Sequence, residues 1–113
     1  MEEMKKWISV LSQIKGVNSV LIINNQGSFV DGSIGEDQAK YISDLCLDLN
    51  QYINSISEKL KKPFTDAFFE FEGKGITLEK IMDNLITVII SDSDANLGKI
   101  RLEIKKIKSA LQG

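Results

Sequence analysis

The chain of 113 residues contains no histidine, one cysteine and one proline. Without histidine it lacks the commonest general base, the usual partner of a catalytic nucleophile and a frequent zinc ligand. Cys46 has no second thiol with which to pair, so nothing in the sequence requires an oxidising compartment. These absences argue against an enzyme, and we expect no metal ion and no cofactor.

Long apolar runs and an excess of one charge are also missing. A membrane-spanning helix needs about 20 apolar residues, and the amphipathic residues 1–15 carry acidic groups unlike a signal peptide. The net charge is −2, from 14 basic and 16 acidic residues, which argues against a dedicated nucleic-acid binder. We therefore expect a cytoplasmic protein without a nucleic-acid partner and without direct membrane insertion, forming one domain over residues 1–113.

What the sequence does contain is a strand that needs cover on both faces. Residues 85–90 read Leu-Ile-Thr-Val-Ile-Ile, an apolar run with no alternating polar face. Periodicity and turn residues predict the other elements around it. The predicted helices are 2–15, 36–62 and 95–111, and the predicted strands are 17–24, 28–30, 65–72, 76–82 and 85–91, in the order α-β-β-α-β-β-β-α.

The long central helix shows one broad apolar stripe and one apolar residue outside it. Tyr41 and Tyr52 flank the stripe, and Leu47 projects nearly opposite to it, which is common at exposed positions but is also found where a helix meets a partner. Pro63 ends the helix because the residue before a proline disfavours helical backbone. The stripe, which we expect to be core, comprises Ile42, Leu45, Cys46, Leu49, Ile53, Ile56 and Leu60.

Several patterns that suggest chemistry have simpler explanations. Glu70 and Glu72 alternate with phenylalanines and are expected to solvate the outer face of a strand. The fragment Gly73-Lys74-Gly75 lacks the rest of a phosphate loop and joins two strands. The basic side of the last helix is expected to be a solvated face.

A fourth pattern is similar to a calcium loop. Asp92, Asp94, Asn96 and Glu103 match its spacing, but Leu97 occupies the position of the sharp-turn glycine. We prefer a helix cap formed by Ser93, Asp94 or Asn96.

The element order and four short features resemble the Roadblock (dynein light-chain) family. The features are Gly16-Val17, the Gly27 hairpin, the Asp83 turn into an apolar strand, and Ala95-Asn96-Leu97-Gly98. The resemblance covers essentially the whole chain, as a single Roadblock-like domain over residues 1–113. It implies an α+β fold: a three-layer α/β/α sandwich whose five-stranded, mostly antiparallel sheet has the order 2-1-5-4-3.

The resemblance also implies a homodimer and a small Ras-like GTPase as partner. The third strand would pair with its twin, and its sequence contains neither proline nor lysine between Ala67 and Phe71 to prevent pairing. From the family architecture, GTPase-binding positions would lie on the outward face of the long helix, at Asp44, Leu47, Gln51 and Ser55. The expected dimer interface comprises Tyr41, Leu47, Tyr52, Ala67, Phe68, Phe69, Glu70 and Phe71.

Two other functions are compatible with these patterns. One is a structural subunit of a motor or membrane-associated complex that makes no GTPase contact. The other is a sensor of calcium or a small ligand on the same fold.

Overall fold

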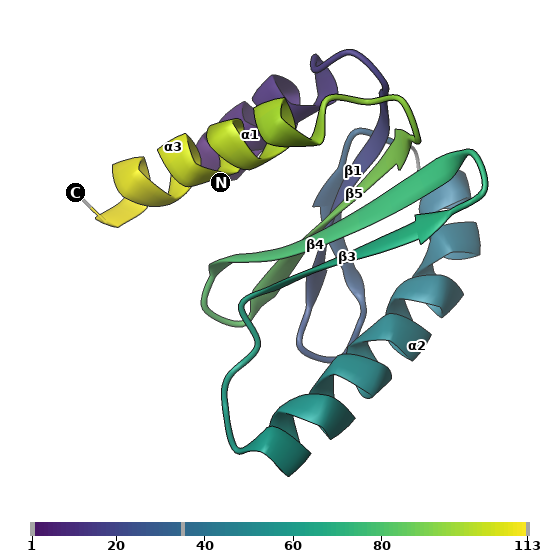
Figure 1. Cartoon of the computed structure of the whole chain (residues 1–113), viewed down its shortest axis with the longest axis vertical. Helices are drawn as coiled ribbons and strands as arrows, with labels where there is room; N and C mark the ends of the chain where they lie inside the picture. The colour runs from purple at the N-terminus through teal and green to yellow at the C-terminus, as the bar shows by residue number, and fades with distance from the viewer. Residues whose placement is uncertain (1, 35, 113) are drawn as a thin grey trace.

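The computed structural model describes the backbone of residues 2–34 and 36–112, without the side chains of residues 2, 36, 37, 39, 41, 43 and 112. Three helices and five strands form three layers, with α2 on one face of the sheet and α1 and α3 side by side on the other (Figure 1). This confirms the predicted element order and fold class. The elements are α1 (Glu2–Ser12), β1 (Val17–Asn24), β2 (Phe29–Gly32), α2 (Glu36–Leu60), β3 (Asp66–Phe71), β4 (Lys74–Met82), β5 (Leu85–Asp92) and α3 (Leu97–Gln112).

The sheet has the order β2-β1-β5-β4-β3, and every neighbouring pair is antiparallel. β5 is the central strand, as its continuous apolar sequence predicted. Ile86 and Val88 point into the core beneath α2, whereas Ile89 points into the core beneath α1 and α3. Because successive side chains of a strand alternate between faces, a strand with cover on both sides must be apolar at nearly every position.

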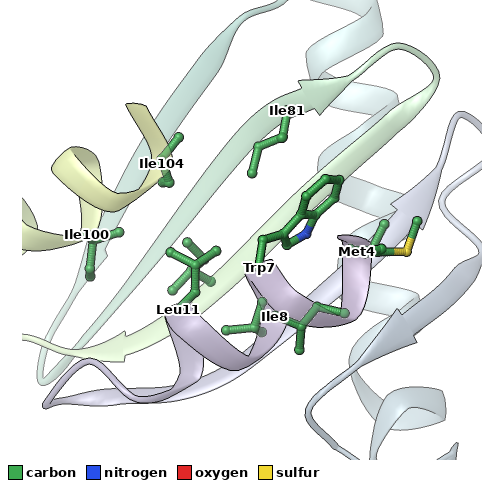
Figure 2. Close-up of a cluster of buried hydrophobic side chains, with 10 residues drawn as sticks. Met4, Trp7, Ile8, Leu11, Ile81, Ile100 and Ile104 are labelled. Atoms are coloured by element: carbon green, nitrogen blue, oxygen red, sulfur yellow. The ribbon is translucent and has the colours of Figure 1, made fainter. Parts of the chain in front are cut away.

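The core beneath α1 and α3 is built from the apolar stripes of both helices. Trp7 and Leu11 of α1 and Ile100 and Ile104 of α3 are buried against one another and against the sheet (Figure 2). The three- and four-residue spacing of these side chains places them on one side of each helix. The remaining buried members of this cluster are Met4, Ile8, Val20, Ile22, Ile81 and Ile89.

The core beneath α2 contains fewer helix side chains. Among the described side chains of α2, Cys46 and Ile53 are the buried apolar ones, and strands β1, β4 and β5 supply the other buried members of this cluster. Burial raises the pKa of the Cys46 thiol to about 11, so the thiol is protonated at neutral pH. The burial of Cys46 confirms its expected place in the core stripe of the helix.

Several predicted boundaries were wrong by a few residues. α1 ends at Ser12 rather than residue 15, and a tight turn follows in which the Val17 N–H donates to the Ile14 carbonyl at 3.0 Å. β2 extends to Gly32, two residues beyond its predicted end, and β4 begins at Lys74, two residues before its predicted start, because the β3–β4 turn is only Glu72 and Gly73. Ile81 faces the α1 and α3 layer, opposite to Ile76 and Leu78, because it is an odd number of residues away from both.

Gly16 joins α1 to β1 at a point where the chain passes closely over the β5–α3 turn. Its φ is +91°, and a Cβ at this position would lie 2.8 Å from the Ala95 Cβ. The Asp92 N–H also donates to the Gly16 carbonyl at 2.8 Å, which fixes the two turns together. Only glycine meets both the conformational and the steric requirement here.

We predict that Gly16→Ala lowers the free energy of unfolding by at least about 2 kcal/mol, as measured by urea denaturation. Gly73→Ala is the matched control, because Gly73 has φ +80° but no atom within 4 Å of an added Cβ. Gly73→Ala should lower the free energy of unfolding by about 1 kcal/mol, which is the cost of placing alanine in the left-handed conformation. Equal losses in the two variants would show that the close approach to Ala95 contributes nothing.

Candidate interface site

Part of the predicted apolar stripe of α2 is exposed rather than buried. Leu45 and Ile56 are each about 40% exposed and Leu60 is 65% exposed, so their expected place in the core was wrong. The buried face of the helix instead centres on Cys46, Asn50 and Ile53. We call the exposed row formed by Leu45, Tyr52, Ile56 and Leu60 the α2 ridge.

A polar side chain explains this orientation of the helix. Asn50 is 4% exposed, and its amide nitrogen donates to the carbonyl of Asn25 in the β1–β2 turn at 2.6 Å. This bond satisfies a buried amide and places the turn beneath the polar side of the helix. The sequence pattern gave no signal for it, because an asparagine within a helix ordinarily counts as an exposed position.

Leu47 lies against the same turn. A Cβ added to Gly27 would be 2.9 Å from the Cα of Leu47, and Gly27 has φ +82°. Leu47 is 40% exposed, as its position outside the apolar stripe predicted, and one side of it packs on the hairpin. Gly27 therefore allows the hairpin to approach α2 closely.

Strand β3 is an open edge of the sheet beside the α2 ridge. Phe69 pairs with Ile76 of β4, and Ala67 with Leu78, so Ala67 and Phe69 lie on the α2 side. Phe68 lies on the opposite side, toward the start of α3, together with the exposed Glu70. The register of β3 on β4 therefore places Phe69 on the α2 side of the sheet and Phe68 on the side of α1 and α3. Phe71, at the end of the strand, is 56% exposed.

A groove of about 290 Å³ connects the ridge to the edge strand. Tyr52, Ile56 and Leu60 line one wall, and Ala67 and Phe69 line the other. Tyr52 is 58% exposed and presents most of its ring to solvent. The two apolar features are therefore one continuous surface, although they come from separate segments of the chain.

The opposite edge of the sheet differs from β3. Strand β2 has four residues against six in β3, and its sequence, Phe-Val-Asp-Gly, places an acidic residue and a glycine at its end. Short edge strands and charged residues discourage pairing with another chain. Of the two edges, β3 is the one suited to association.

The predicted GTPase-binding positions occupy a different side of α2. Asp44, Gln51 and Ser55 are exposed and polar, and they lie about one half-turn from the buried Cys46 and Ile53. The structure thus separates these residues from the α2 ridge, whereas Leu47 borders the hairpin. Tyr41, which we predicted at the dimer interface, lies outside the described side chains.

The residues of the calcium-like pattern have separate partners. Asp92 accepts from the Lys74 ammonium at 2.8 Å, and this bond, together with the positive charge of Lys74, lowers the pKa of the Asp92 carboxyl. The same lysine also donates to Asn18 at 2.7 Å. Asn96 caps α3 by accepting from the Lys99 N–H at 3.0 Å, one of the three predicted caps. Within the described residues, no group of three or more acidic or cysteine side chains is placed to hold a metal ion.

Charged groups of α3 pair mainly within the helix. Glu103 lies 3.1 Å from the Lys99 ammonium and 3.4 Å from that of Lys106, and the bond from Lys99 is the main cause of the lowered pKa of the Glu103 carboxyl. Lys108 reaches the sheet and pairs with the buried Glu79 of β4 at 2.8 Å. Because these ion pairs involve only two carboxylates, α3 keeps an excess of positive charge.

The arrangement of layers and strands is that of the Roadblock/LC7 domain. A Roadblock/LC7 domain from Streptomyces avermitilis matches the structure with a TM-score of 0.80 at 11% identity, over 95% of this chain and 92% of that one. MglB in a tetrameric arrangement matches with a TM-score of 0.77 at 17% identity, over 97% and 85% of the two chains. MglB from Myxococcus xanthus matches with a TM-score of 0.74 at 20% identity, over 96% and 94%.

These identities show the shared fold alone. No protein-family model matches the chain, and no curated protein is similar to it in sequence. Among the described helices, none has the length and apolar character needed to cross a bilayer.

Proposed function

We propose that this chain is a single Roadblock-like domain, residues 1–113, that works as a non-catalytic homodimer and binds a small Ras-like GTPase. The observation that supports the dimer most directly is the continuous apolar surface of the α2 ridge, the groove and strand β3. Exposed apolar surface next to an open strand edge favours either aggregation or a specific interface.

A dimer with its two-fold axis beside β3 would bury both the open edge of β3 and the α2 ridge. Two β3 strands pairing in antiparallel fashion would form a continuous sheet of both protomers and bring the two α2 ridges together on one face. Tyr52 supplies an aromatic anchor of the kind enriched at interfaces, and Phe69 and Phe71 supply apolar area on the same side. The structurally similar MglB has been described in a tetrameric arrangement, which supports the proposal that this chain self-associates.

The GTPase would bind the outward face of α2, at Asp44, Leu47, Gln51 and Ser55. This face is exposed and is distinct from the α2 ridge, so a dimer would leave it accessible. The support is the family resemblance together with this separation. Arg101 is the only arginine and lies on α3, across the sheet from α2, so it does not act as an arginine finger for a GTPase bound there. Any effect on hydrolysis would come from orienting groups of the GTPase itself.

We predict that Phe71→Lys converts a dimer into a folded monomer, as measured by light scattering. A lysine at this exposed end of β3 places a charge between two paired strands without disturbing the core. Val30→Lys is the matched control, because Val30 is 44% exposed on β2, the other edge. It should remain dimeric with unchanged circular dichroism.

A wild-type monomer at high micromolar concentration would contradict the dimer. So would an equal loss of association in the two lysine variants, because that would place the contact elsewhere.

We predict that the double variant Asp44→Lys/Gln51→Lys weakens binding to a small Ras-like GTPase encoded in the same genome by at least about tenfold. Ser109→Lys, an exposed change on α3, should bind as the wild type does. Light scattering on each variant alone shows whether it is still a dimer, so that weaker GTPase binding can be told apart from dissociation of the dimer.

Purification of the protein from its native cells tests the rival function. A large motor or membrane-associated assembly that copurifies without any GTPase would favour the structural-subunit hypothesis and would contradict the GTPase proposal.

A further inference from the structure

The layer formed by α1 and α3 concentrates the positive charge of the molecule. Residues 2–15 and 97–112 hold eight of the 14 basic residues but only three of the 16 acidic ones. The rest of the chain is therefore acidic, and the modest net charge of −2 conceals a strong asymmetry between these two segments and the remaining sequence. α1 and α3 lie side by side on one face of the sheet, so their lysines share one surface (Figure 1).

α3 carries five basic residues and one acidic residue, so most of its cations lack a counter-charge on the same helix. Arg101 and Lys105 are exposed and form no ion pair with any described residue, and Lys99 and Lys106 share the single carboxylate of Glu103. The basic residues are therefore not neutralised by the helix that carries them. An isolated solvated helix face commonly balances its charges through such pairs.

Each of the two basic helices also exposes an aliphatic side chain. Leu102, in the outward arc of α3 opposite its buried side, is 48% exposed, and Val10 of α1 is 42% exposed. On the inner side, Ile100 and Ile104 are buried and hold α3 firmly on the sheet. The ion pair between Lys108 and the buried Glu79 also ties α3 to β4. The outward arc is thus a rigid surface that combines positive charge with exposed aliphatic groups.

We propose that this α1–α3 face binds the surface of an anionic lipid bilayer. Anionic headgroups attract each lysine or arginine close to the surface, and a bilayer interface also accepts aliphatic side chains such as Leu102 and Val10. Nucleic acid fits less well, because its recognition ordinarily adds aromatic side chains for stacking, and Trp7, the aromatic residue of this layer, is buried. The contact is peripheral and requires no inserted helix.

This proposal stands apart from the dimer and the GTPase. The α1–α3 face lies across the sheet from α2, so a monomer retains it. A dimer formed through β3 would place two such faces on the same side of one sheet and would strengthen binding through two-point attachment.

The test is co-sedimentation of the full chain with phosphatidylcholine vesicles containing about 30% phosphatidylserine, and with pure phosphatidylcholine vesicles, at low and high salt. We expect binding to the anionic vesicles alone, with loss at high salt. Arg101→Glu/Lys105→Glu should lower the partition coefficient by about 30-fold or more, because two attractive charges become repulsive. Leu102→Ser should lower it by about fivefold.

The matched control is Lys40→Glu/Lys61→Glu, which makes the same change in net charge at two exposed lysines on the α2 side of the molecule, away from the lining of the groove. Its partition coefficient should stay within about twofold of the wild type. An equal loss in both double variants would overturn the assignment to the α1–α3 face. Failure of the wild type to bind anionic vesicles at low salt, or tighter binding to duplex DNA or RNA than to these vesicles, would overturn the proposal.

Discussion

The structure depends on the burial of β5 between two helical layers. Ile86 and Val88 face α2, and Ile89 faces α1 and α3, so neither layer is dispensable. A central strand of this kind needs a hydrogen-bonded neighbour on each side, which β1 and β4 supply. With β5 in the middle, the sheet ends at the short strand β2 on one side and at β3 on the other. The order that buries β5 therefore leaves β3 as an exposed edge.

The parts of the fold that local sequence patterns determine could be predicted. An apolar run of six residues indicated a strand with cover on both faces, and β5 is the central strand of the sheet, buried between the two helical layers. The rotation of α2 could not be predicted, because it depends on Asn50 donating to a carbonyl 25 residues earlier. Hydrophobic periodicity assigns asparagine to solvent, so it placed Leu45, Ile56 and Leu60 in the core. The faces of Phe68 and Phe69 likewise required the long-range register of β3 on β4.

The two faces of the molecule suit different partners. The α2 ridge and β3 form an apolar surface that would be satisfied by a second copy of the chain, and the polar side of α2 stays open for a GTPase. The α1–α3 layer carries most of the positive charge, with Leu102 and Val10 exposed among it. A dimer held at a bilayer through its basic layer would present α2 on the side away from the bilayer, where a GTPase could reach it. The three proposed contact surfaces, for the twin copy, the GTPase and the bilayer, use different residues. The exception is Leu47, which was predicted both at the dimer interface and at the GTPase-binding face.

The measurement that tests the dimer most directly is amide hydrogen exchange of β3, residues Asp66–Phe71, over a range of protein concentrations. In a monomer, the outward amides of an edge strand exchange with water, whereas pairing with a twin strand protects them. We predict protection in β3 that rises with concentration, with no such change in β2. Rapid exchange in β3 at every concentration, beside a stably protected β4, would contradict the proposed homodimer.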